Sequence, residues 1–163
     1  MYGYSTSQSF TRPNDTTPYG SGDLIANSTT AGSVAPMTFL IPNQRYTRIT
    51  KAKVMKSGST ATNANFRLHL YQDSPTVTNG DNGAIVSIEA NYIGFINVDC
   101  TGSTFSDDCS GVGVFVTNSV YAPLSIYGDA DHLIYGLLEA RAAYTPGALE
   151  VFTITLTGET VSP

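Results

Sequence analysis

The chain contains a series of short segments in which apolar and polar residues alternate, separated by stretches rich in Gly, Pro, Asn and Asp. Alternation with a period of two predicts a half-buried β-strand. The strongest case is LEVFTITL at 149–156, which places Phe152, Ile154 and Leu156 on one face. FRLHLY at 66–71 repeats the pattern. Both segments therefore predict strands with one face on a core.

Further segments bring the chain to roughly eight strands. They are 34–41, 51–55, 85–88, 90–99, 112–116, 121–127 and 133–144. LLEARAA at 137–143 also has high helix propensity. However, the segment 133–144 alternates, and a Thr-Pro-Gly turn leads from it directly into the strand at 149–156. We therefore expect these two segments to pair as a C-terminal hairpin.

Many short strands, frequent turns and the lack of a long helical pattern indicate an all-β fold. We expect a single antiparallel β-sandwich domain over residues 34–163. A jelly roll is the leading topology and an immunoglobulin-like sandwich is the second. The pattern leaves the strand order open.

Residues 1–33 form a polar, turn-rich lead in which Pro13 and Pro18 prevent regular helix. A short strand is expected at most at 9–12. One interpretation is a disordered tail, but disordered tails are poor in aromatic residues. The other is an extended arm that becomes ordered on a neighbouring molecule. Its candidate contact residues are Tyr2, Tyr4, Phe10, Arg12 and Tyr19.

The charge of the chain is unevenly distributed. The 163 residues include 8 Lys and Arg and 13 Asp and Glu, for a net charge of −5. We expect the strands of the region 45–71 to pair as a hairpin, which gathers six cations and no acid into one patch: Arg45, Arg48, Lys51, Lys53, Lys56 and Arg67. These cations either solvate and protect an exposed strand or form a docking face for an acidic protein surface.

The composition limits the classes of partner that this protein is expected to bind. An acidic chain without a recognised nucleic-acid-binding motif does not favour nucleic acid. No stretch approaches the ~20 apolar residues of a membrane helix, and MYGYSTSQSF lacks the basic and apolar regions of a secretory signal. We therefore expect synthesis in a cytoplasm and no membrane partner. Ten Tyr and only 13% charged residues suit a surface covered by partners.

The two cysteines, Cys100 and Cys109, flank an acidic loop. They are expected as two thiols, or as a local disulfide after release into an oxidising medium. His69 is expected on the outward face of its strand, as a surface residue. Asp73 and Asp81 resemble calcium ligands but lack the spacing of a calcium loop.

The group of residues that comes nearest to a catalytic site is Asp129, Asp131 and His132. We expect these residues to form a solvated turn, because no further acid, base or metal ligand lies near them in the sequence. The chain has no GxSxG, HExxH, P-loop or paired-Cys motif. We therefore expect no enzymatic activity, no cofactor and no metal.

Four long stretches resemble, in the same order, a family of small structural proteins of tailed bacteriophages. They are YSTSQSFTRPNDTTPYGSGDLIANSTTAGSV (4–34), FRLHLYQDSPTVTNGDNGA (66–84), NYIGFINVD (91–99) and IYGLLEARAAYTPGALEVFTITL (134–156). The loop at 100–109 departs from that pattern. The resemblance rests on whole segments, so it carries no list of functional residues.

The resemblance implies a head decoration, or cement, protein. Such a protein would sit on the outer capsid surface of the virion, bind the major capsid protein and staple its neighbouring subunits. It would also associate with itself as a dimer or trimer, because symmetric assemblies present symmetric sockets. One alternative is a glycan- or receptor-binding module of a tail or fibre, which would use a Tyr-lined groove. Another is a hydrolase, which would need two convergent acids in a pocket.

Overall fold

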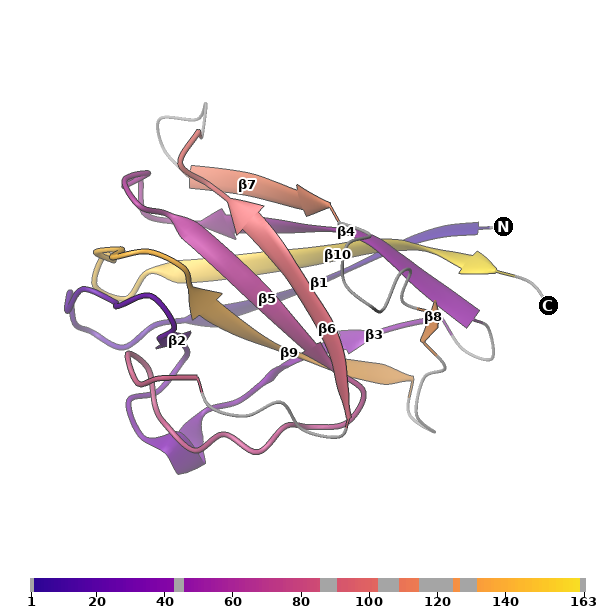
Figure 1. Ribbon diagram of the computed structural model, residues 1–163, viewed down its shortest axis with the longest axis horizontal. Coiled ribbons are helices and arrows are strands. Elements are labelled where there is room, and N and C mark those ends of the chain that lie inside the picture. Colours follow the sequence, from indigo (N-terminus) through magenta and orange to yellow (C-terminus); the bar gives the residue numbers. More distant parts are fainter. Residues whose placement is uncertain are drawn as a thin grey trace.

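In the computed structural model, the chain folds as two antiparallel β-sheets stacked face to face (Figure 1). The structure describes residues 2–42, 46–85, 91–102, 109–114, 125–126 and 132–161. The strands are β1 (Tyr2–Thr11), β2 (Leu24–Ile25), β3 (Met37–Leu40), β4 (Tyr46–Lys56), β5 (Asn65–Tyr71), β6 (Tyr92–Asp99), β7 (Cys109–Val114), β8 (Ser125–Ile126), β9 (Leu133–Ala140) and β10 (Val151–Val161), with one 3-10 turn, η1 (Ala31–Ser33).

Among the described residues, each sheet has five strands. The first, here the β4 sheet, has the order β1-β10-β4-β7, and β8 also pairs with β4. The second, here the β9 sheet, has the order β2-β9-β5-β6, and β3 also pairs with β9. The predicted all-β class and sandwich architecture are confirmed. The described residues include no helix with the length and hydrophobicity of a membrane span.

Both predicted hairpins are wrong, although their strands exist. β4 and β5 lie in opposite sheets, and so do β9 and β10. Their connections, residues 57–64 and 141–150, are long enough to cross the ~10 Å between stacked sheets. Alternation identifies the face of a strand that meets the core, and this face is the same whether the next strand lies beside it or opposite it.

The expectation of an arm at residues 1–33 is also wrong for the described residues 2–33. β1 pairs with β10 along its whole length, from Tyr2 opposite Thr160 to Thr11 opposite Val151. The following segment buries Tyr19, Leu24, Ile25 and Ala26. The aromatic and apolar residues of this region are therefore part of the sandwich itself.

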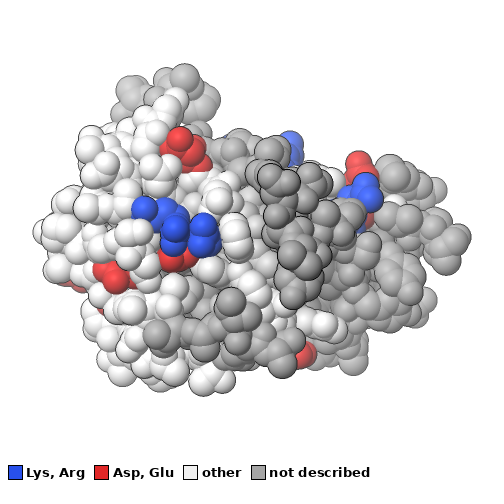
Figure 2. All heavy atoms as spheres, in the orientation of Figure 1, with Lys and Arg blue, Asp and Glu red and all other residues white. Residues whose placement is uncertain are grey.

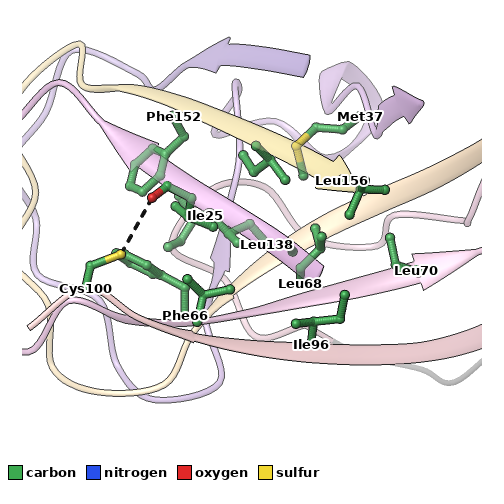
Figure 3. Close-up of a cluster of buried hydrophobic side chains, with 14 of the residues drawn as sticks. Ile25, Met37, Phe66, Leu68, Leu70, Ile96, Cys100, Leu138, Phe152 and Leu156 are labelled. Carbon is green, nitrogen blue, oxygen red and sulfur yellow. Dashed lines mark hydrogen bonds between the residues drawn. The ribbon is translucent and has the colours of Figure 1, made fainter. Parts of the chain in front are cut away.

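The core lies between the two sheets. In the close-up of Figure 3, Phe152 and Leu156 of β10 face Phe66 and Leu68 of β5, with further residues from β6 and β9. Phe152 stacks on Phe10 with ring centroids 5.6 Å apart and meets Phe66 edge-on at 5.4 Å. The first contact joins β1 to β10 within one sheet, and the second holds β10 against the opposite sheet. Aromatic pairs of this kind contribute about 0.5–1.5 kcal/mol beyond area burial.

The buried Cys100 follows β6, and its Sγ lies 4.0 Å from the carbonyl oxygen of Val54 (Figure 3). The side chain of Cys109 lies outside the described residues. The expected choice between two thiols and a disulfide therefore stays a prediction.

Candidate functional site

Three of the six predicted patch residues lie together on the outer surface of the β4 sheet. In β4, Ala52 and Val54 are buried in the core, so Lys51 and Lys53 point outward. A β-bulge falls between the pairs Thr157–Lys51 and Gly158–Ile49. A bulge adds one residue to one strand, which keeps Arg48 on the same face. We call Arg48, Lys51 and Lys53 the basic strip.

The basic strip adjoins two rows of hydroxyl groups. Lys53 lies level with Thr155 of β10, which lies level with Ser7 of β1. The Ser7 and Thr155 hydroxyl oxygens are 2.7 Å apart, and those of Ser9 and Thr153 are 2.8 Å apart. The outer faces of β1 and β10 therefore carry short hydroxyl side chains beside a row of cations, with the acidic Glu159 near one end of β10.

The cations of the basic strip lack counter-ions in the part of the chain that the structure describes. Glu159 lies level with Arg48 in the ladder, yet the two form no ion pair within 4.0 Å. Arg45 lies outside the described residues. The strip is therefore a positive surface with little internal compensation.

Lys56 does not belong to this surface. Its side chain is fully buried, and its Nζ lies 3.2 Å from Glu150 Oε1 and 5.2 Å from the centre of the Tyr144 ring. The Tyr144 hydroxyl donates a hydrogen bond to the same carboxylate. Lys56 holds the loop between β9 and β10 against the end of β4, because a buried charge requires a partner. Its prediction as a docking residue is wrong.

Arg67 lies on the opposite surface of the sandwich, because β5 belongs to the β9 sheet. Its Nε donates to Asn97 Oδ1 at 2.9 Å, and its guanidinium lies 4.1 Å from the centre of the Phe95 ring. Burial, followed by the charge of Arg141, lowers the pKa of Arg67. Since the fold separates Arg67 from the basic strip, the predicted six-residue patch does not form.

Arg67 instead borders a cluster around Glu139, whose side chain is 5% exposed. Glu139 accepts from Arg141 at 2.8 Å and contacts His69 Nε2 at 2.7 Å. His69 Nδ1 lies 3.0 Å from the Tyr92 hydroxyl. We call Arg67, His69, Tyr92, Glu139 and Arg141 the Glu139 cluster. Figure 2 shows cationic and acidic atoms gathered on this face, over β5 and β9.

The contacts within the Glu139 cluster limit the exposure of His69 and lower the pKa of Glu139. His69 lies on the outward face of β5, as expected, but its side chain is only 14% exposed and contacts partners through both nitrogens. Burial alone would raise the pKa of Glu139. Hydrogen bonds from His69 and Arg141, together with their charges, outweigh it and hold that pKa below its usual range. Sequence reasoning missed the cluster because its residues come from β5, β6, β9 and the residue that follows β9, which are far apart in the sequence.

A second buried ionic group joins the N-terminal region to the loop before β6. Asp81 accepts hydrogen bonds from Arg12 Nη2 at 2.9 Å, from the Tyr19 hydroxyl at 2.7 Å and from the Ala26 amide at 2.8 Å. Arg12 Nε also donates to the Tyr19 oxygen. Arg12 and Tyr19, which were expected on the surface of an arm, are each 1% exposed.

The remaining candidate residues that the structure describes form no common site. Tyr4 and Phe10 are partly buried against the core, and the side chain of Tyr2 lies outside the described residues. Asp129 and Asp131 lie outside them as well. Among the residues that are described, no three ligating side chains gather into a metal site. Asp73 is exposed.

Comparison with known proteins returned no match for this chain among protein families, curated proteins or solved structures.

Proposed function

We propose that this protein is a non-enzymatic structural component of a tailed-bacteriophage virion, a decoration protein on the outer capsid surface. In this role it binds the major capsid protein and staples neighbouring subunits. The proposal combines the segment resemblance with one observation, the basic strip on an otherwise acidic chain, whose three cations form no ion pair with any residue that the structure describes. Complementary charge sets the orientation and partner of a docked protein more than its raw affinity.

The geometry of the strip suits this role. The short Ser and Thr side chains of β1 and β10 allow close approach, and Arg48, Lys51 and Lys53 supply the long-range attraction to an acidic surface. Each exposed charge pair contributes at most about 1 kcal/mol. Many copies on a lattice convert such weak contacts into avidity.

The strand order supports a jelly roll as the scaffold. If β2 and β3 are counted as one strand and the two-residue β8 is omitted, consecutive strands occupy positions 1-8-3-6 in one sheet and 2-7-4-5 in the other. A double-sheet jelly roll is an eight-strand fold of two Greek keys. The immunoglobulin order, with ABED and CFG sheets, fits less well.

The test is co-sedimentation with purified heads that lack this protein. Lys51→Gln/Lys53→Gln should weaken binding by about tenfold at low salt and by less at high salt, because salt screens exposed charges. A matched control is Thr60→Asp/Thr62→Asp, which lowers the net charge by the same two units at two exposed positions of the loop 57–64. Equal binding by both variants would leave the strip as a solvated face. No binding by the wild type would refute the cement role.

A receptor- or glycan-binding module is the second candidate, and the Glu139 cluster favours it. The cluster presents guanidinium groups beside Tyr92 and Phe95, and the latter is 36% exposed. Charged side chains next to aromatic rings suit the recognition of polar ligands with apolar faces. A glycan array tests this candidate, and binding that disappears in Arg141→Ala would favour it over the cement role.

A further inference from the structure

β1 is a long edge strand with an open side. It pairs with β10 in an uninterrupted register from Tyr2 to Thr11, and among the described residues no strand pairs with its other edge. In an antiparallel ladder, alternate residues direct their backbone N–H and C=O groups away from the partner. About half of the residues of β1 therefore present unpaired backbone groups along this edge.

This edge lacks the features that usually prevent strand pairing. Natural edges are shortened, bulged, or supplied with Lys or Pro. β1 has ten residues, YGYSTSQSFT, with no charge, no Pro and no register shift. The strands on the same side of the other sheet, β2 and β3, have two and four residues. β1 is therefore a template for pairing.

The inner side of β1 is also incompletely covered. Tyr4, Thr6, Gln8 and Phe10 point toward the sandwich, but each remains partly exposed. Their ladder partners in β10 (Gly158, Leu156, Ile154 and Phe152) are all buried. The opposite sheet thus covers β10 fully and β1 only in part. A further strand beside β1 would cover the exposed parts of these side chains.

We propose that β1 pairs antiparallel with β1 of a second copy, around a two-fold axis at Ser7. This register places Ser7 opposite its own copy, Ser5 opposite Ser9, and Tyr4 opposite Phe10. The aromatic pair lies on the inner side, where cross-strand aromatic contacts stabilise a sheet. The strand carries no charge, so no like charges face each other along the paired edge. The two β4 sheets become one continuous sheet through an isologous contact.

The occupant is a second copy because the strand is complementary to itself in polarity, size and pattern. The competing hypothesis is that a strand from another protein pairs with β1. In that case the purified chain should be a monomer in solution. The proposal does not depend on capsid binding, since its test uses the purified chain alone.

The first experiment measures dimerisation by sedimentation equilibrium, with folding checked by thermal melting. The wild type should be a dimer, and Ser7→Lys should weaken dimerisation by about fivefold, because it places like charges directly opposite each other. Thr155→Lys is the matched control. It adds the same charge to the same rung and face and removes the same hydroxyl contact, but it lies in β10, away from the edge. Its dimer should be unchanged.

The second experiment tests the register by disulfide trapping. Cβ atoms of directly opposed residues lie about 4.5–5.5 Å apart, so Ser7→Cys should cross-link two copies under mild oxidation. Ser9→Cys should not, because residue 9 and its copy are offset by four residues, about 13 Å. A wild type that stays monomeric up to high micromolar concentration would overturn the proposal. So would a dimer that Ser7→Lys leaves intact and Ser7→Cys does not cross-link.

Discussion

The buried group around Asp81 gives the sharpest test of how the N-terminal region is held. Asp81 and Arg12 side chains are both 0% exposed and lie 2.9 Å apart. Asp81→Asn keeps the shape and still lets one oxygen accept from Tyr19 and Ala26. It removes the closer and fully buried of the two carboxylates beside Arg12, which then keeps the carbonyl of Gly147 at 3.1 Å and the partly exposed Asp15 carboxylate at 3.6 Å.

Breaking a buried ion pair by neutralising one partner typically costs about 3–5 kcal/mol, because the other charge stays buried without compensation. For a chain of this length, each kcal/mol lowers the melting temperature by about 2–4 °C. We therefore expect Asp81→Asn to lower the melting temperature by roughly 6–20 °C. Arg12→Met in the same background should recover part of the loss, because no uncompensated charge then remains.

The assay is urea unfolding followed by circular dichroism, with free energies of unfolding compared at equal denaturant slope. Asp15→Asn is the control. The Asp15 carboxylate lies 3.6 Å from the same guanidinium, but its side chain is 34% exposed. Its loss should stay below about 1 kcal/mol. If Asp81→Asn cost no more than Asp15→Asn, or if Arg12→Met deepened the loss, the buried-charge account would be wrong.

Two further predictions concern pH and backbone geometry. The pKa of Glu139 is held below its ordinary value of 4.5, so the advantage of the wild type over Glu139→Gln should be complete above that value. It should disappear as the pH falls through the lower folded-state pKa, and unfolding in urea from neutral pH to about pH 3 checks this. Gly158→Ala should destabilise by about 1–3 kcal/mol, because a Cβ there would lie 2.3 Å from the Arg48 carbonyl oxygen. Gly3→Ala has its nearest contact at 3.9 Å and should be neutral by the same melt.

The alternation of apolar and polar residues predicted strands correctly where one face of the strand is fully buried. The predicted segments 66–71, 90–99 and 149–156 correspond to β5, β6 and the first half of β10. It failed for β1, whose inner face carries Thr6 and Gln8 between its aromatic residues. An edge strand that is covered only in part does not need a continuous apolar face, so its pattern is weak.

The charge prediction failed for two separate physical reasons. Linear proximity does not imply spatial proximity when a connection crosses between sheets, which moved Arg67 to the opposite surface. Strand parity then separated Lys56 from Lys53, since residues an odd number apart point to opposite faces. Lys56 shares the inward parity of Val54, and its burial requires Glu150, a residue distant in sequence. The sequence around Arg67 and Lys56 therefore does not reveal which residues they contact.

The basic strip and the β1 edge are geometrically linked although they are tested separately. Both belong to the β4 sheet, in which β10 alone separates β1 from β4. A two-fold pairing at Ser7 therefore sets two basic strips on one continuous face, with the hydroxyl rows of both copies between them. Capsid binding by such a dimer would depend on salt more steeply than binding by one copy, because twice as many cations contribute. Ser7→Lys and Lys51→Gln/Lys53→Gln separate the two contributions. The first lowers avidity by dissociating the dimer while each strip remains intact, and the second weakens each strip while the dimer persists.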